Sequence, residues 1–463
     1  MSDIDTNLNN TEELSATKNV RLKCDTKGES DVLFSDDVKS KTKLGSNADL
    51  PLAPAGKPAS ATPSPRGSAP KTPECHTDSI LLTQNQGNHT FIDLFAGAGG
   101  LSLGLEQAGF SPIFVNEIVP QFNETYRKNR NLSDEQYFVG DIKELNEKID
   151  EYLSRFKDAD LVCGGPPCQG FSMANRQRII EDPRNQLYKE YLKLLSVVRP
   201  KFFIMENVRG MSNKWEEIKE NFETYLNKDH EQQYQFTSQL LYAEDFGVPQ
   251  HRERFIVIGN RLGINPEIVF AEIFKNKKKA FVLKDALEGL PQLGAKSVKG
   301  KNDIEDSNSG FTECDFEYKE NDFHHFINGN KKLHKLYNHK NRYNNPRDIE
   351  IYTRLPQGAN SLHESISDIM PYKSRNDIFK DKYFKLEEDK ICKTITSHMR
   401  FDCNMYIHPW CSRGLSPREA ARIQTFPDDY IFYGSQNSWY AQIGNAVPVK
   451  LAYAIGRGIA KFL

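Results

Sequence analysis

The chain has 463 residues, with 61 Lys or Arg against 63 Asp or Glu and a formal net charge of −2. This length predicts one to three domains, and the near-neutral balance neither favours nor excludes a polyanionic partner, because such footprints are local. No apolar run approaches the ~20 residues of a membrane span and the acidic start lacks the regions of a signal peptide, so we expect a soluble protein of the cytoplasm.

The first compositional break lies near residue 90. Residues 1–89 are polar, with seven prolines from Pro51 to Pro73 and few large apolar side chains. Such a segment cannot bury enough apolar surface to fold, so it is predicted to be a disordered tail. It could be a spacer or a binding tail, and the sequence leaves both open.

From residue 90 the pattern alternates between strand and helix. Apolar runs predict strands at 91–95, 113–116, 161–163, 202–205, 238–242 and 255–258, and helical stretches at 101–108 and 186–198. This alternation predicts an α/β fold with a doubly wound sheet.

Ligands of such sheets sit beyond the carboxyl ends of the strands. A Gly-rich turn, residues 96–100, follows the first strand, where a ligand could approach the backbone closely. Glu117 and Asp141 stand at later strand ends and could accept a ribose and an exocyclic amine. The alternatives are a tight turn without a ligand, and carboxylates that are solvated or cap a helix.

Cys168 occupies a stiff turn directly after the strand at 161–163. Pro166 and Pro167 precede it, and they prevent the loop from collapsing into a helix. A thiol held there could attack a substrate. The alternative is a buried, inert cysteine, the commonest fate of a free thiol.

The other cysteines show no metal or disulfide pattern. The eight are Cys24, Cys75, Cys163, Cys168, Cys314, Cys392, Cys403 and Cys411. None forms a CxxC pair, so we expect a reducing compartment and no metal site.

Six segments, taken in chain order, resemble the motifs of cytosine-C5 DNA methyltransferases. They are residues 91–100, Pro166-Pro167-Cys168-Gln169, Glu206-Asn207-Val208, residues 250–254 (Gln-His-Arg-Glu-Arg), residues 418–422 (Arg-Glu-Ala-Ala-Arg) and residues 442–448 (Gln-Ile-Gly-Asn-Ala-Val-Pro). The resemblance implies a Rossmann-like S-adenosylmethionine-dependent domain at 90–274, completed by 396–463, with a smaller target recognition domain inserted at 275–395.

The resemblance also implies the catalytic roles. Cys168 would add to C6 of cytosine, which makes C5 nucleophilic, and Glu206 would hydrogen-bond N3 and the amino group in a protonated form that burial favours. Arg254 would hold the cytosine O2, and Arg252 would order the catalytic loop or a phosphate. For Glu206 and the two arginines, ordinary surface or ion-pair roles are the alternatives.

S-adenosylmethionine is the methyl donor that the resemblance implies. The positions that match cofactor contacts are Phe95, Ala96, Gly97, Gly99, Gly100, Glu117, Ile118, Asp141, Ile142, Pro166, Leu187, Asn445 and Val447. Phe95 would lie against the adenine, Glu117 would bind the ribose, and Asp141 with Ile142 the adenine edge. Ile118 departs from the bulky aromatic that many members carry there, so one stacking contact is in doubt.

Residues 323–347 give the best local polyanion footprint. They hold six Lys or Arg and four histidines, with aromatic residues interleaved and no acid. The predicted DNA contacts are Lys331, Lys332, Lys340 and Arg342 here, with Gln169 and Ser172 on the catalytic loop. A solvated charged face is the alternative, and without a cysteine at ligand spacing the histidines do not predict a metal.

The activity that the resemblance implies is DNA (cytosine-5)-methylation in a prokaryotic modification system. The target base would be flipped out of the duplex before reaction. We expect a monomer associated with the nucleoid, and possible pairing with a restriction endonuclease that shares the site without direct contact. The alternatives are a tRNA cytosine-5 methyltransferase, disfavoured by the residues after Cys168 and by the long insert, and a non-catalytic DNA-binding regulator, disfavoured because Cys168, Glu206 and Arg254 are all present.

Overall fold

The computed structural model describes residues 89–167, 186–299, 304–371 and 382–463. The predicted tail therefore lies outside the described residues, apart from His89. None of the described helices has both the length and the apolar character that a membrane crossing requires.

Seven strands form one sheet. They are β1 (His89–Leu94), β2 (Phe110–Glu117), β3 (Tyr137–Val139), β4 (Leu161–Gly164), β5 (Phe202–Val208), β6 (Gln235–Tyr242) and β7 (Glu253–Asn260). Their order is β3-β2-β1-β4-β5-β7-β6, in which β7 runs antiparallel to both neighbours and the remaining pairs are parallel. All six predicted strands are present, with boundaries shifted by a few residues, and the predicted doubly wound α/β fold is confirmed.

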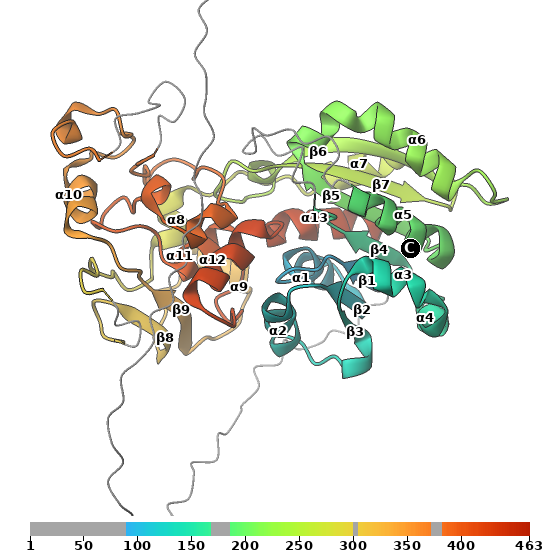
Figure 1. The fold of residues 1–463 in the computed structure, drawn as a ribbon, viewed down its shortest axis with the longest axis horizontal. Helices are drawn as coiled ribbons and strands as arrows, with labels where there is room; N and C mark the ends of the chain where they lie inside the picture. The colour runs from blue at the N-terminus through green and yellow to red at the C-terminus, as the bar shows by residue number, and fades with distance from the viewer. Residues whose placement is uncertain (1–88, 168–185, 300–303, 372–381) are drawn as a thin grey trace, which may run out of the picture. The chain divides into compact units, whose positions relative to one another are not determined.

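Helices cover both faces of this sheet (Figure 1). One face packs against α1 (Gly100–Gln107), α7 (Pro266–Phe274) and α13 (Val449–Ile459), and the other against α3 (Ile142–Glu147), α4 (Ile149–Phe156), α5 (Leu187–Val198) and α6 (Trp215–Leu226). Successive side chains of β1 point to opposite faces of the sheet, so Phe91 packs in the core on the first face and Ile92 in the core on the second. The remaining helix of this half, α2 (Pro120–Lys128), follows β2.

The last helix, α13, lies against α1. Gly104 of α1 allows the contact, because a Cβ built there would lie 2.4 Å from the Cβ of Ala452. This contact places the C-terminal helix beside the helix that follows the Gly-rich turn.

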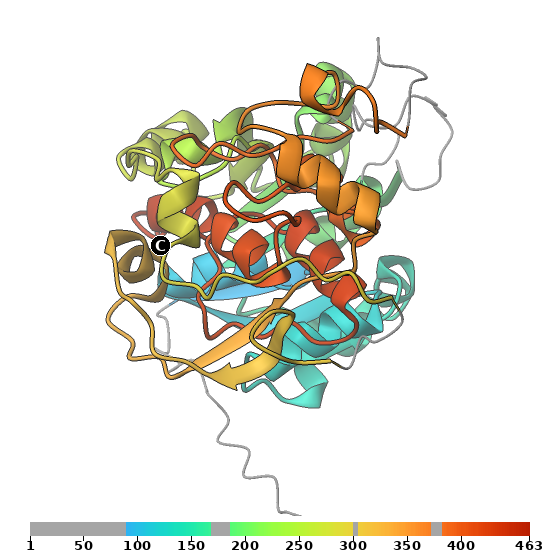
Figure 2. The ribbon, with the colours of Figure 1, turned by 90° about the vertical axis from the view of Figure 1, so that its left-hand side faces the viewer.

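A third core lies outside the sheet layers (Figures 1 and 2). Its elements are α8 (Leu283–Leu287), α9 (Asp322–Asn328), α11 (Pro417–Ile423) and α12 (Gln436–Asn445), and nearby lie the hairpin of β8 (Gly310–Asp315) and β9 (Lys335–Lys340) and the helix α10 (Pro346–Arg354). Ile395 and Met399 both belong to this core, so its packing continues across the predicted boundary at 395/396.

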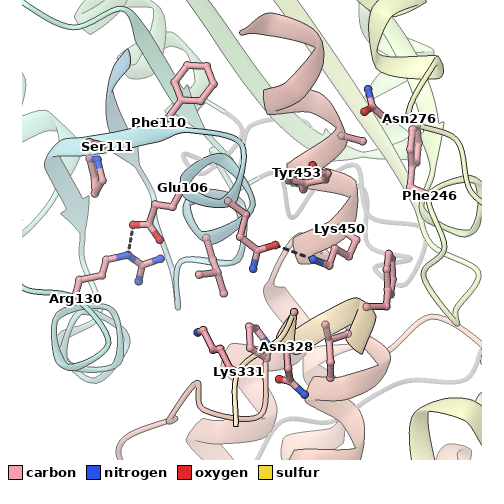
Figure 3. A pocket seen from close by; sticks show the side chains of 18 of the residues that line it. Glu106, Phe110, Ser111, Arg130, Phe246, Asn276, Asn328, Lys331, Lys450 and Tyr453 are labelled. Carbon is pink, nitrogen blue, oxygen red and sulfur yellow. Dashed lines mark hydrogen bonds and ion pairs between the residues drawn. The ribbon is translucent and has the colours of Figure 1, made fainter. Parts of the chain in front are cut away.

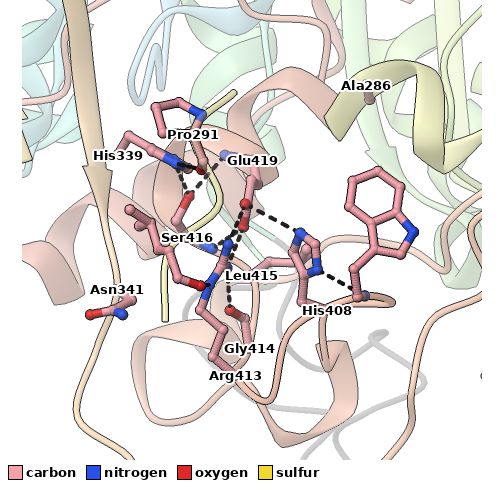
Figure 4. Close-up of polar contacts among 12 residues, drawn as sticks. Ala286, Pro291, His339, Asn341, His408, Arg413, Gly414, Leu415, Ser416 and Glu419 are labelled. Atoms are coloured by element: carbon pink, nitrogen blue, oxygen red, sulfur yellow. Dashed lines mark hydrogen bonds and ion pairs between the residues drawn. The ribbon is translucent and has the colours of Figure 1, made fainter. Parts of the chain in front are cut away.

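A buried polar network holds the start of α11 (Figure 4). The guanidinium of Arg413 donates two hydrogen bonds of 2.7 Å to the two carboxylate oxygens of Glu419, and Nε2 of His408 lies 3.4 Å from the same carboxylate. All three side chains are at most 2% exposed. Although burial works to raise it, the charges of Arg413 and His408 hold the pKa of Glu419 well below its usual range.

Glu419→Gln is expected to lower the free energy of unfolding by about 3–5 kcal/mol, because it leaves the Arg413 charge buried without its counter-charge. Urea unfolding at neutral pH measures this. The matched control is Glu217→Gln, which removes an exposed pair with Lys214 and should cost less than about 1 kcal/mol. Equal losses in the two variants would contradict a stabilising role for the buried pair.

Candidate active site

The Gly-rich turn after β1 has the backbone that only small residues adopt easily. Gly97 and Gly99 have φ angles of 56° and 77°, and Phe95 shares this left-handed region with a φ of 57°. A Cβ built on Gly97 would meet no atom within 4 Å, so there is open space in front of the turn. A ligand can therefore approach the backbone here, as the sequence predicted.

Glu117 ends β2 beside this turn. Its two carboxylate oxygens accept hydrogen bonds from the backbone N–H groups of Gly97, at 2.7 Å, and Val119, at 2.8 Å. It is 6% exposed, and this burial raises its pKa. Glu117 is therefore not a solvated carboxylate. Each oxygen keeps a second lone pair that could accept a ribose hydroxyl.

The end of β3 extends this edge. Asp141 caps α3, with its Oδ1 accepting a hydrogen bond of 2.9 Å from the backbone of Lys143. Ile142 is 2% exposed and packs in the core, so only its backbone could meet a cofactor. By contrast, Ile118 and Val139 are exposed apolar side chains, although Ile118 is smaller than the aromatic that the family pattern favours.

Some of the remaining predicted cofactor residues lie around the same turn. Phe95 and Leu187 are both partly buried against one core cluster, and Pro166 is buried at the end of β4. The carbonyl of Val447 lies 2.5 Å from a Cβ built on Gly100, so residues 446 and 447 close against the turn. Asn445 is exposed at the end of α12.

A carboxylate near the end of β5 contacts a guanidinium of β7. Oε1 of Glu206, near the end of β5, lies 2.5 Å from Nε of Arg254 on the neighbouring β7. Both side chains are nearly buried, at 13% and 10% exposed. Burial lowers the pKa of Arg254, and the Glu206 charge opposes this shift. Glu206 and Arg254, to which the resemblance assigns neighbouring atoms of a cytosine, thus contact each other.

Gly165 brings the loop towards Cys168 close to this pair. A Cβ at this position would lie 2.8 Å from Oε2 of Glu206. Asn207 supports the loop, because its Nδ2 donates a hydrogen bond of 2.9 Å to the carbonyl of Pro166. Sequence reasoning quoted Asn207 in a motif without giving it a role. Cys168, Gln169 and Ser172 lie outside the described residues.

Arg252 has different contacts from Arg254. It is 2% exposed, and its guanidinium donates to the carbonyls of Ile395, Gly444 and Ala446 at 2.5, 3.0 and 2.8 Å. Burial and the charge of Arg254 hold its pKa well below the usual range. These contacts connect Arg252, directly before β7, to Ile395 and to the C-terminal end of α12. Its predicted role at the catalytic loop or a phosphate has no contact among the described residues.

Comparison with known proteins shows what this arrangement belongs to. A family model described as C-5 cytosine-specific DNA methylase matches residues 89–461. The Type II methyltransferase M1.HphI of Haemophilus parahaemolyticus is 33% identical over 383 residues, which cover 80% of this chain and 87% of that protein. The Type II methyltransferase M.FnuDI of Fusobacterium nucleatum is 33% identical over 374 residues, with 80% and 94% covered.

The chain belongs to the cytosine-C5 DNA methyltransferase family. Among solved structures, a prophage-encoded chain from E. coli described as a DNA modification methyltransferase aligns with a TM-score of 0.61 and 26% identity, over 81% of this chain and 99% of that one. This DNA (cytosine-5)-methyltransferase uses S-adenosylmethionine as methyl donor, as the family implies. The open Gly-rich turn, the Glu117 carboxylate and the uncovered Ile118 suit its methionine, ribose and adenine parts.

Three of the six cations in the predicted basic footprint of the methyltransferase form ion pairs in the structure. Lys331 pairs with Asp429 at 2.7 Å and Lys340 with Glu305 at 2.9 Å, while Arg342 donates to the carbonyls of Met399 and Phe401. Residues 323–347 therefore do not form one free basic face, because acids from other segments lie against them. Lys332 is exposed and keeps its prediction as a DNA contact.

The histidines of this stretch also differ in their surroundings. His324 and His339 are each 2% exposed, and burial lowers the pKa of His339 to about 4. Within the described part of the chain, no group of three His, Cys, Asp or Glu side chains could hold a metal ion.

Asp93 of β1 is a buried acid that sequence reasoning passed over. It is 1% exposed, accepts hydrogen bonds from Ser102 Oγ and from Cys163 Sγ, and its pKa is raised to about 7 by burial. The neighbouring Cys163 is a buried thiol, and burial raises its pKa well above the usual value.

The buried Asp93 predicts a pH-dependent stability. The folded state holds a proton that the unfolded carboxyl releases above about pH 4, so its contribution to stability falls as pH rises towards 7. In Asp93→Asn this slope is absent. The gap between the unfolding free energies of variant and wild type should widen in favour of the variant by about 3 kcal/mol from pH 5 to pH 8. The same difference in unfolding free energy between variant and wild type at every pH, measured by urea unfolding, would refute this prediction.

Proposed function

We propose that the methyltransferase acts through a covalent adduct between Cys168 and C6 of a flipped-out cytosine. The thiolate donates its electron pair to C6, and the C5=C6 electrons shift towards N3, where Glu206 supplies a hydrogen bond and proton. Bound S-adenosylmethionine would supply an electrophilic methyl group, and its S–CH3 bond would break as the C5 electron pair forms the new C–C bond, leaving S-adenosylhomocysteine. N3 would return its proton to Glu206. Loss of the C5 proton to water then returns an electron pair to C5=C6, and the C6–S bond breaks to release the thiolate.

The observation that carries this proposal is the contact between Glu206 and Arg254 beside Gly165. A carboxyl group and a guanidinium that contact each other could both reach one ring, and Gly165, beside them, precedes Cys168 by three residues. N3 and O2 are neighbours on one edge of cytosine, so both side chains would contact that edge, with Glu206 at N3 and the amino group and Arg254 at O2. The guanidinium then keeps a hydrogen-bond acceptor when the ion pair opens.

We assign the cofactor roles to predicted residues that lie along one edge of the sheet, at the carboxyl ends of its strands. The turn at Gly97 and Gly99 holds the methionine part, Glu117 binds the ribose, and Asp141 with the backbone of Ile142 binds the adenine edge. Their support is the shared position at the carboxyl ends of β1, β2 and β3.

The biological setting is also a proposal. Residues 275–395 would read a short DNA site, and Lys332 with Gln169 and Ser172 would contact the strand. The names of the relatives, Type II methyltransferases, support a place in a restriction-modification system, with a possible endonuclease for the same site. We propose a monomer that works in the bacterial cytoplasm, where its DNA lies.

Transfer of labelled methyl groups tests this function. The purified protein is given labelled S-adenosylmethionine with genomic DNA or with tRNA, and modified cytosines are mapped by sequencing. Label at C5 in a short DNA site is expected. A duplex with 5-fluorocytosine in that site should form a stable complex, because fluorine cannot leave as the proton does, and peptide mapping should find the nucleotide on Cys168. Label on tRNA alone, or on DNA without a trapped complex, would overturn the proposal.

A further inference from the structure

A large pocket lies at the far end of β2 from the cofactor turn, and Figure 3 shows side chains that line it. It has a volume of about 1020 Å³ and is lined by the end of α1, the start of β2, the middle of α13 and the segments around Lys278 and Lys331. Phe110, at the start of β2, lines this pocket, whereas Glu117, at the end of the same strand, faces the cofactor turn. The two sites thus lie at opposite ends of one strand.

Three lysines from distant segments line the pocket. Lys278 follows α7, Lys331 follows α9, and Lys450 lies in the first turn of α13. Burial and the charges of Lys278 and Lys331 lower the pKa of Lys450 to about 8. The positive charges are therefore close enough to repel one another, and a bound anion would relieve this repulsion.

The acidic side chains at the pocket already form ion pairs with other cations. Glu106 pairs with Arg130 at 2.6 Å, and Lys331 takes Asp429 as its partner. Lys450 donates only to the neutral amide of Gln107, at 2.9 Å. None of the described acidic side chains lies within ion-pair distance of Lys278 or Lys450. These two cations are available to an anionic ligand.

Aromatic side chains stand beside these cations. The Nζ atoms of Lys278 and Lys450 lie 4.5 Å and 5.2 Å from the centre of the same ring, that of Phe326. Tyr453 and Phe246 complete this aromatic part of the wall. A planar ring could stack here while an attached anion reaches the two ammonium groups.

We propose that this pocket binds a free nucleoside polyphosphate at a site separate from the active site. Lys278 and Lys450 bind its phosphates, and Phe326 with Tyr453 contacts its base. The pocket volume is near the upper end of the range for small-molecule sites, which suits a ligand of this size. Every base has a flat face, so the structure does not select one base, and ATP is a suitable probe.

Isothermal titration calorimetry of the full chain with ATP tests the proposal. Saturating S-adenosylhomocysteine fills the cofactor site, so that adenine cannot bind there. Binding at micromolar ATP is expected, weakened at least tenfold by Lys278→Gln with Lys450→Gln. The matched control is Lys277→Gln, which changes a neighbouring lysine that pairs with Asp245 and does not line the pocket, and should leave the affinity within twofold.

Two further arms separate the parts of the ligand. Inorganic tripolyphosphate should bind at least tenfold more weakly than ATP, and Phe326→Leu should weaken ATP binding without affecting tripolyphosphate. Thermal unfolding checks that each variant is folded. Absence of ATP binding up to millimolar concentration, equal binding in the double lysine variant, or equal affinity for tripolyphosphate would overturn the proposal, since the last result indicates non-specific anion attraction.

Discussion

Replacing Cys168 with serine is expected to lower the rate of methyl transfer by a factor on the order of 10⁴ or more, since removal of a covalent nucleophile has effects of this size. A serine hydroxyl is almost fully protonated at neutral pH, whereas a thiol supplies some thiolate and is intrinsically more nucleophilic. Single-turnover transfer of labelled methyl groups to the mapped DNA site measures the loss.

The surroundings of the other described cysteines support the choice of this thiol. Cys163, Cys392 and Cys403 are buried, and burial raises the pKa of each thiol. The matched control is Cys314→Ser, which changes a partly exposed cysteine of β8 and should keep the wild-type rate within twofold. Activity of Cys168→Ser within tenfold of wild type would rule out the covalent route.

Glu206→Gln is expected to lower kcat by about 10²- to 10⁴-fold, the range for loss of a general acid. Glutamine keeps the size of the side chain but cannot deliver a proton to N3 as negative charge builds on the ring. It also removes the counter-charge of Arg254, so the guanidinium loses its partner at 2.5 Å. Single-turnover kinetics at saturating DNA and cofactor separates kcat from binding.

The control for this substitution lies on the adjacent residue of β7. Glu253 forms an exposed ion pair with Arg209 at 2.9 Å, so Glu253→Gln removes a similar charge outside the strand-end pair. Its kcat should stay within about twofold of wild type. Equilibrium binding of S-adenosylhomocysteine should be unchanged in both variants, because neither residue belongs to the cofactor turn. A normal kcat in Glu206→Gln would exclude the carboxyl as the proton donor.

The strands and the cofactor turn were accessible from sequence because their signals are local. Apolar runs such as residues 202–205 predict a strand wherever they occur in an α/β pattern, and β5 was found there. Likewise, Gly97 and Gly99 have the positive φ angles that a turn after a strand requires. The order of the motifs further predicted that Glu206 and Cys168 act on the same base. The close approach of Gly165, in the loop that leads to Cys168, to Glu206 supports this prediction.

The role of each charged side chain was decided only by the tertiary structure. The stretch at 323–347 has no acid of its own, yet Lys331 meets Asp429 and Lys340 meets Glu305 across long loops. Arg252 and Arg254 are two residues apart, but one is tied to three backbone carbonyls and the other faces Glu206. Sequence determined the family, the sheet and the candidate reactive groups. Folding decided which charges stay free, because an ion pair depends on distances between segments that sequence spacing does not encode.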